Sequence, residues 1–150
     1  MIFQALTVSF KEQLLKGVHD FTTDTFFLAL YTNAADLSAS TPIYTPLGEV
    51  IGTGYTAGGK QLVNLGVATG GDNAYTSFAD AVWTGPNKFS VAGGLIYNAS
   101  KGNTSIVTLN FGMVYDVNIL TDYTIKFPPF TSQNAPIILG NSYYSAGAPS

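Results

Sequence analysis

The sequence predicts an all-β fold, an antiparallel β-sandwich or jelly roll with one short N-terminal helix. Short apolar runs rich in β-branched and aromatic residues recur along the chain, and turn-forming residues separate them roughly every eight to twelve residues. No helical pattern alternates with these runs, which argues against a parallel sheet. The strongest local signal is a hairpin in which the runs 89–97 and 104–111 flank a polar tip, residues 98–103.

The composition indicates one domain whose surface is largely covered by something else. A chain of 150 residues is long enough to bury a core, so we expect a single β domain over 1–150. Within it, residues 1–8 are a candidate N-terminal arm and residues 140–150 a candidate flexible tail. Charged residues make up only 10% of the chain, against roughly 25% in typical soluble domains. So few charges protect a lone protein poorly against association, which points to partners, including copies of itself.

Several classes of partner are not expected. The net charge is −3, arginine is absent and the six lysines are scattered singly, so nucleic acid is a poor fit. Cysteine is absent, so there is neither a disulfide framework nor a thiolate metal site. The opening MIFQALTVSFKEQ has no basic start and no long apolar run, so we expect no signal peptide. No apolar stretch approaches the ~18 residues of a membrane span, so no membrane partner is expected.

The first element is predicted to be a short amphipathic helix. Ser9 and Glu12 have the spacing of a capping box, and Gly17 suits a helix end. The apolar face at helical spacing comprises Phe10, Leu14 and Val18. We expect this helix either to pack on the sheet or to act as an arm that docks on a neighbouring subunit.

The next segments alternate between strands and long connections. Residues 25–31 form a near-continuous apolar run, which is typical of a strand that is buried on both faces or lies in a sandwich core. Residues 33–48 form a long polar connection with two prolines, a kind of loop that is usually functional or contact-making. Residues 49–55 fit either a short strand or part of that loop, and a diglycine turn precedes a predicted strand at 61–68.

The remaining elements are short strands and turns. Trp83 is a predicted core anchor, and the pair Gly93 and Gly94 inside the first hairpin strand predicts a bulge or a close backbone approach. The other predictions are a turn at 69–73, one or two strands within 75–84, a connection at 112–122, and strands at 123–127 and 135–139.

Candidate catalytic residues are few and do not form a recognisable set. His19 is the single histidine, and its place just past the helix end favours a structural role facing the last carbonyls. Asp80, Asp116 and Asp122 are the candidate carboxylates for a glycosidase, but their spacing pairs none of them, and Asp116 and Asp122 look like turn residues. Asp72 lacks the spaced acidic partners of a calcium site. We therefore predict no enzyme and no catalytic, cofactor-binding or metal-binding residue.

Aromatic residues are the most suggestive part of the composition. Phenylalanine and tyrosine together number nineteen, and the amphipathic tyrosine ring suits interfaces. Two interpretations stay open, that these tyrosines serve association or that strands simply favour tyrosine. The tyrosines predicted at strand ends, in loops or in the tail are Tyr31, Tyr44, Tyr55, Tyr143 and Tyr144.

Three stretches in the same order resemble a family of small tailed-bacteriophage structural proteins, the capsid decoration or cement proteins. They are residues 9–41, residues 49–68, and the hairpin with GLIYNASKGN and VTLNFG followed by YTIKFPP. The resemblance implies a jelly-roll or sandwich protein, made in the host cytoplasm, on the outer capsid surface of the virion. It further implies that the protein braces major capsid protein subunits as a homo-oligomer, a dimer or trimer, and carries no catalytic residues.

Alternatives to this function remain at the level of the sequence. Exposed aromatic residues beside Asn and Asp would also suit a phage tail fibre or baseplate module that binds a host surface glycan. A glycan-cleaving enzyme would need two of Asp80, Asp116 and Asp122 within about 10 Å across a cleft. For the decoration protein, we expect the capsid contacts to come from residues 1–7 and the 33–48 loop.

Overall fold

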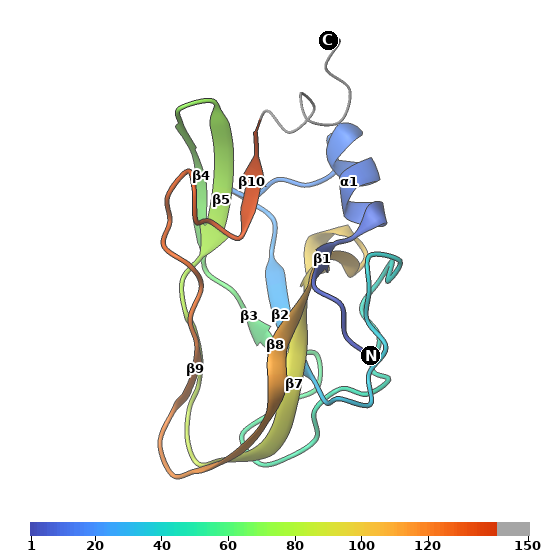
Figure 1. Cartoon of the computed structure of the whole chain (residues 1–150), viewed down its shortest axis with the longest axis vertical. Helices are drawn as coiled ribbons and strands as arrows, with labels where there is room; N and C mark the ends of the chain where they lie inside the picture. Colours follow the sequence, from blue (N-terminus) through green and yellow to red (C-terminus); the bar gives the residue numbers. More distant parts are fainter. Residues whose placement is uncertain (141–150) are drawn as a thin grey trace.

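A computed structural model describes residues 1–140 of the chain, and β-strands dominate it (Figure 1). The helical elements are α1 (Val8–Leu15) and the single 3-10 turn η1 (Ala99–Lys101). The strands in chain order are β1 (Ala5–Leu6), β2 (Phe26–Tyr31), β3 (Lys60–Gln61), β4 (Asn64–Gly70), β5 (Asn73–Phe78), β6 (Ala81–Trp83), β7 (Asn87–Asn98), β8 (Thr104–Ile119), β9 (Tyr123–Ile125) and β10 (Ile137–Leu139). All strand pairs are antiparallel, which confirms the predicted fold class.

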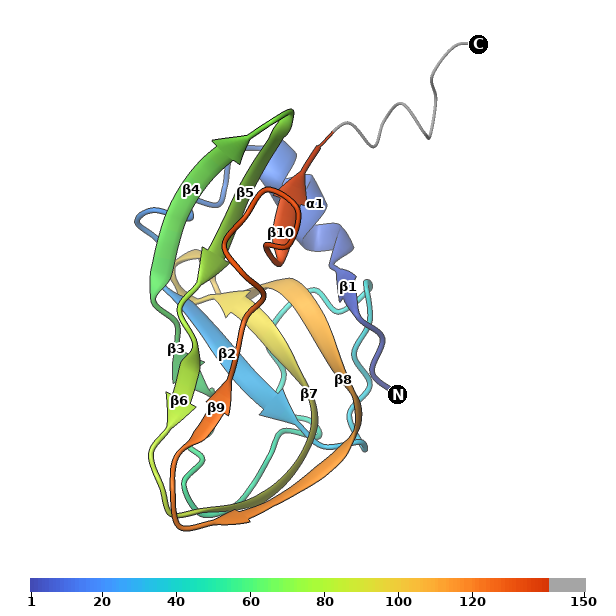
Figure 2. The same ribbon diagram turned by 60° about the vertical axis from the view of Figure 1, so that its left-hand side comes forward.

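The predicted hairpin is the centre of the main sheet. In the described residues this sheet has five strands in the order β1-β8-β7-β2-β3. A three-stranded sheet, β10-β5-β4, and a two-stranded one, β6-β9, form a second layer that packs against it (Figure 2). The core between the layers contains Phe26 from β2, Phe89 from β7, Phe78 from β5 and the predicted anchor Trp83 from β6.

Strand β2 is buried on both faces, as its apolar run predicts. Phe26, Leu28 and Leu30 point into the core between the layers. Ala29 and Tyr31 point the other way, where the 33–48 segment packs on them. The long loop therefore supplies the second cover that a helix or sheet would otherwise provide.

Hairpin strand β8 is longer than predicted. Residues 112–122 were expected to form a connection, but β8 runs to Ile119 and pairs with β7 to its end. The register jumps between the pairs Gly93–Asn110 and Val91–Tyr115, so residues 111–114 bulge out opposite Ala92. Gly112 adopts φ +86° there, and the bulge absorbs the glycine without ending the strand.

The predicted role of the paired glycines in β7 is confirmed. Gly93 lies at the register shift, and a Cβ built on it would stand 2.4 Å from the carbonyl oxygen of Leu109. A Cβ on Gly94 would stand 2.9 Å from the side chain of Leu28. Gly93 combines the bulge and the close backbone approach that sequence reasoning offered as alternatives, whereas Gly94 is in regular register and is limited by a side chain.

The prediction of one continuous strand at 61–68 is wrong, because this segment contributes to two strands in different sheets. Lys60 and Gln61 pair with β2 in the main sheet, whereas Asn64–Gly70 pairs with β5 in the second layer. The chain therefore crosses between layers at 62–63. The segment 75–84 likewise divides into β5 and β6, and residues 49–55 belong to the loop, contacting strands only through isolated bridges.

The helix begins two residues earlier than the capping box predicted. Thr7 is the N-cap, with extended backbone, and its Oγ1 accepts a hydrogen bond from the N–H of Phe10 at 3.3 Å. Thr7 is fixed by β8, because its N–H donates to Ile106 and its hydroxyl to the carbonyl of Ser105. Pairing in β1 therefore decides where the helix starts. The predicted stop at Gly17 is confirmed, with φ +70°.

Candidate functional site

The 33–48 loop and the N-terminal residues lie side by side over the outer face of the main sheet. Leu37 donates its N–H to the carbonyl of Met1 and accepts one from Phe3, and the ammonium group of Met1 donates to Ala35 at 2.8 Å. Ile2, in the N-terminal segment, is buried in the cluster that includes Leu37 of the loop and Ala29 of β2. The candidate arm at 1–8 is therefore packed on its own chain, and the two segments predicted to make contacts form one structural unit.

This unit exposes a set of large apolar side chains, which we call the contact face. Its members are large hydrophobic residues at least 47% exposed, namely Met1, Phe3, Val8, Ile43 and Leu47. A groove of ≈ 560 Å³ opens within the loop, lined by residues from Ala34 to Gly48. Single exposed apolar residues are ordinary, but a group on two bonded segments marks a candidate interaction surface.

The loop is held in shape by a buried carboxylate. Glu49 is 8% exposed, and its Oε2 accepts a hydrogen bond from the hydroxyl of Tyr44 at 2.6 Å. Its Oε1 accepts from the hydroxyl of Tyr55 at 2.6 Å and from the N–H of Gly58 at 2.7 Å. Among the described residues no cation pairs with Glu49. Three donors therefore stabilise this charge, as a buried carboxylate requires.

Neighbouring hydroxyl groups extend the network to the strands. Tyr55 Oη accepts the N–H of Leu30 in β2 at 2.9 Å while donating to Glu49. The hydroxyl of Tyr31 donates to the carbonyl of Thr45 at 2.6 Å, and that of Tyr97 donates to Gly58 at 2.6 Å. The loop is thus tied to β2 and β7 at several points, which preorganises the contact face.

The electrostatics of this network keep its phenols protonated. Burial raises the pKa of Tyr44 and Tyr55 well above the usual 10, and the hydrogen bond to Glu49 raises both further. Burial is also the main cause of the raised pKa of Tyr31. Each hydroxyl therefore stays a donor at every pH at which the protein would function.

Three of the tyrosines lie where they were predicted, Tyr31 at the end of β2 and Tyr44 and Tyr55 in loops, but their side chains turn inward. Tyr31 is fully buried, and Tyr44 and Tyr55 are half-buried and turned toward Glu49. These phenols organise the loop internally and leave the surface to aliphatic residues and Phe3. Tyr143 and Tyr144 lie outside the described residues. The sequence does not mark Glu49 as the centre of the network, because a glutamate in a polar loop is usually exposed and its burial becomes visible only in the fold.

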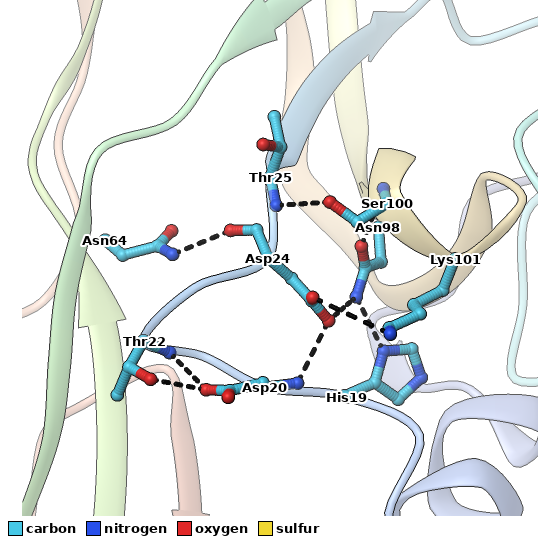
Figure 3. A network of polar contacts seen from close by, with 9 residues as sticks. All are labelled: His19, Asp20, Thr22, Asp24, Thr25, Asn64, Asn98, Ser100 and Lys101. Atoms are coloured by element: carbon cyan, nitrogen blue, oxygen red, sulfur yellow. Dashed lines mark hydrogen bonds and ion pairs between the residues drawn. The ribbon is translucent and has the colours of Figure 1, made fainter.

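His19 has a structural place, although a different one from that predicted. Figure 3 shows the ring beside Asn98, at the end of β7. Its two nitrogens contact the side chains of Asn98 and Gln13 rather than the last helix carbonyls. Nδ1 lies 2.9 Å from the amide nitrogen of Asn98, which can only donate, so Nδ1 is the acceptor. Nε2 then carries the proton and donates to Gln13 at 2.9 Å. Burial lowers the pKa of His19 below its usual 6.5, which fits this neutral form.

The same amide connects the hairpin tip to the 19–25 loop. Asn98 is fully buried and donates its second amide hydrogen to the carboxylate of Asp24 at 2.8 Å. Asp24 also accepts the N–H of Asp20 and faces Lys101 at 3.9 Å (Figure 3). Burial opposes ionisation of Asp24, but the bonds from Asp20 and Asn98 together lower its pKa. In the described residues no serine or threonine hydroxyl bonds to His19.

The three candidate glycosidase carboxylates are used at three different places. Asp80 accepts the N–H of Phe127 at 3.1 Å, and Asp122 accepts that of Gly85 at 3.0 Å. Asp116 accepts the hydroxyl of Ser90 across the hairpin, so its prediction as a turn residue is wrong. Asp72 lies in the predicted turn between β4 and β5. Among residues 1–140 no three histidine or acidic side chains gather as a metal ion would need.

A second cavity lies between α1 and the three-stranded sheet. It encloses ≈ 360 Å³, and most of its lining side chains are apolar, including Phe10, Leu14 and Leu139. His19 and Asp20 are at its polar end, where the carboxylate of Asp20 is already bound by Thr22 (Figure 3). A sugar would find few free hydrogen-bonding partners there.

Comparisons with known proteins assign no function to the chain, so the geometry described above is the basis for inferring one. No helix in the described part of the chain is both long and apolar enough to cross a membrane. No family model, curated protein or solved structure matches the chain.

Proposed function

We propose that this protein is a non-enzymatic structural protein of a tailed phage. In this proposal it decorates the outer capsid surface and stabilises contacts between major capsid protein subunits. The observation that carries the proposal is the contact face: two segments with exposed apolar side chains, bonded together and anchored by Glu49. A rigid body with a preformed apolar surface suits a protein that braces its neighbours. The resemblance in three ordered stretches is the reason for proposing the major capsid protein as the partner.

Symmetry explains how modest contacts would suffice. On a shell, each decoration site recurs many times, and an oligomer engages several sites at once. Avidity therefore gives tight attachment without any single strong site. The low charge of the chain supports this role, because surfaces that are covered in an assembly need few solvating charges.

The test uses phage heads that lack this chain, to which purified protein is added back. Head occupancy is measured by sedimentation, and the bound protein is located by electron microscopy. We expect Leu47→Gln and Phe3→Gln to reduce occupancy at least tenfold. Leu15→Gln is the matched control, because Leu15 is 92% exposed at the end of α1, outside the contact face. Truncating residues 1–7 is a poor test, since β1 and the cap Thr7 belong to the fold.

Different results separate the parts of the proposal. Full occupancy by Leu47→Gln and Phe3→Gln would rule out the contact face while leaving the capsid role standing. Protein found at a few copies on the tail, rather than at hundreds on the head, would overturn the capsid role. That result would favour the alternative, a tail fibre or baseplate module that binds a host surface glycan.

A further inference from the structure

Most of the border of the main sheet is covered by other parts of the chain. Along β2 the outer edge is capped by the 48–62 segment, through bonds such as that from Val50 to Leu30 and that from Leu62 to Phe26. The first half of β8 is covered by the N-terminal residues and by Pro42, whose carbonyl accepts the N–H of Ser105. The border formed by the second half of β8, past the residues that pair with β1, is uncovered: within residues 1–140 no segment bonds to the outer side of 115–119 (Figure 2).

One hydrogen bond establishes which backbone groups this bare edge presents. Lys88 in β7 donates its N–H to Thr53, on the side away from β8. In an antiparallel pair, both polar groups of a residue face the same side, so Lys88 and its partner Asn118 are a non-hydrogen-bonded pair. The N–H and C=O of Asn118 therefore point outward. Alternation along the strand gives the same direction to Asp116.

The side chains of this edge are arranged so that two copies of the edge would complement each other. Asp116 and Asn118 share one face of β8, and Tyr115, Val117 and Ile119 share the other. Val117 is buried, whereas Tyr115 and Ile119 are 43% and 37% exposed, so the second layer leaves them uncovered. The edge has no lysine or proline, the residues that usually protect a sheet border.

We propose that the 115–119 edge of β8 pairs with the same edge of a second copy, about a two-fold axis at Val117. This register places each Asp116 opposite Asn118 of the other copy, so a carboxylate meets an amide donor. It pairs Tyr115 with Ile119 and joins the two sheets through four backbone hydrogen bonds. A register centred on Asp116 would oppose two carboxylates. One centred on Asn118 would place Asp116 opposite Leu120, beyond the end of the strand.

Other sheet edges are less suited to a second copy. Strand β4 carries a register shift at Asn64 and Val67, with Gly66 at φ +83°, and such a bulge blocks regular pairing. Strands β9 and β10 have three residues each. No residue of the 115–119 edge belongs to the contact face, and the proposed dimer does not depend on the proposed capsid role.

The first experiment measures mass in solution by light scattering over a range of concentrations. We expect twice the 15.8 kDa of one chain for the unmodified protein. Asn118→Pro should be a folded monomer with a cooperative melting curve that no longer depends on protein concentration, because the lost N–H faces solvent in the monomer and edge strands accept proline there. Asn118→Ala is the matched control and should still dimerise, since it keeps the backbone donor.

The second experiment tests the register and needs no change to the backbone. The chain has no cysteine, so Asp116→Cys and Asn118→Cys can be made without background. Mixing the two variants should give a disulfide-linked dimer, since the paired Cα atoms lie about 5.5 Å apart, whereas each variant alone should crosslink at least tenfold less. A monomer at every concentration, a mass of three chains, a dimer that survives Asn118→Pro, or equal crosslinking by the single variants would each overturn the proposal.

Discussion

Removing the carboxylate of Glu49 is the sharpest test of how the loop is held. Glu49→Ala leaves two phenolic hydroxyls and the N–H of Gly58 without their acceptor. Hydrogen bonds to a charged group contribute about 1.5–3 kcal/mol each, and the relief of a buried charge offsets part of their sum. We expect the free energy of unfolding to fall by about 3–5 kcal/mol, the range for stripping one member from a buried charged network.

The melting temperature is a second measure of the stability that Glu49→Ala loses. For a chain of this length, each kcal/mol corresponds to about 2–4 °C, so Glu49→Ala should melt roughly 10 °C lower. Glu49→Gln keeps the shape but loses the charge, and it turns an amide group toward the hydroxyl of Tyr44. It should cost about 1.5–3 kcal/mol. Glu12→Gln is the control, because Glu12 is exposed on α1 and bonds only to Lys16; little change is expected.

The order of two phenylalanine variants tests the same network independently. Tyr44→Phe removes one donor to Glu49, whereas Tyr55→Phe also removes the acceptor of the Leu30 N–H. Tyr55→Phe should therefore be the more destabilising. Urea denaturation measures all four free energies. If Glu49→Ala lies within about 1 kcal/mol of the unmodified protein, or if Tyr44→Phe costs more than Tyr55→Phe, the network does not hold the loop as argued.

Three further predictions concern the rest of the fold. Because burial lowers the pKa of His19, the unfolded chain takes up the proton first as the pH falls. The contribution of His19 to stability is full above the usual pKa of 6.5 and should be lost as the pH falls below it. His19→Gln should remove that slope, which denaturation at each pH measures. Asn98→Ala strips partners from Asp24, His19 and Ser100 and should cost about 2–4 kcal/mol, whereas Asn103→Gly, at φ +60° on the exposed tip, should be near neutral by the same assay. Gly93→Ala should cost about 1–3 kcal/mol, because its Cβ meets the carbonyl of Leu109; thermal melting that matches the parent would refute the close approach.

Features that depend on neighbouring residues were predictable from the sequence. The hairpin, the buried strand β2, the stop at Gly17 and the close approach at Gly93 all follow from local residue type and spacing. The start of the helix was not predictable in this way, because the pairing of β1 with β8 makes Thr7 rather than Ser9 the N-cap. The end of β8 was missed for a related reason: a bulge at Gly112 lets a strand continue past a residue that usually ends one.

The site residues depend on contacts far apart in the chain, which one sequence does not encode visibly. Asn98 meets His19 across 79 positions, and Ser90 meets Asp116 across 26. Within the loop, Glu49 is close in sequence to Tyr44 and Tyr55, yet its burial follows from the loop folding back over β2. A glutamate next to glycines reads as a solvated loop residue until that packing is known.

The acidic residues bear on the proposed association, because most of them are already bound within the chain. The composition already has only 10% charged residues. Five of the carboxylates are bound by the chain's own donors as anchors between segments: Glu49, Asp24, Asp80, Asp116 and Asp122. Carboxylates bound in this way solvate the surface less than free ones, so the exterior is less protected against association than the composition suggests. Exposed apolar residues on the contact face and a bare strand edge then have few charges to oppose a partner.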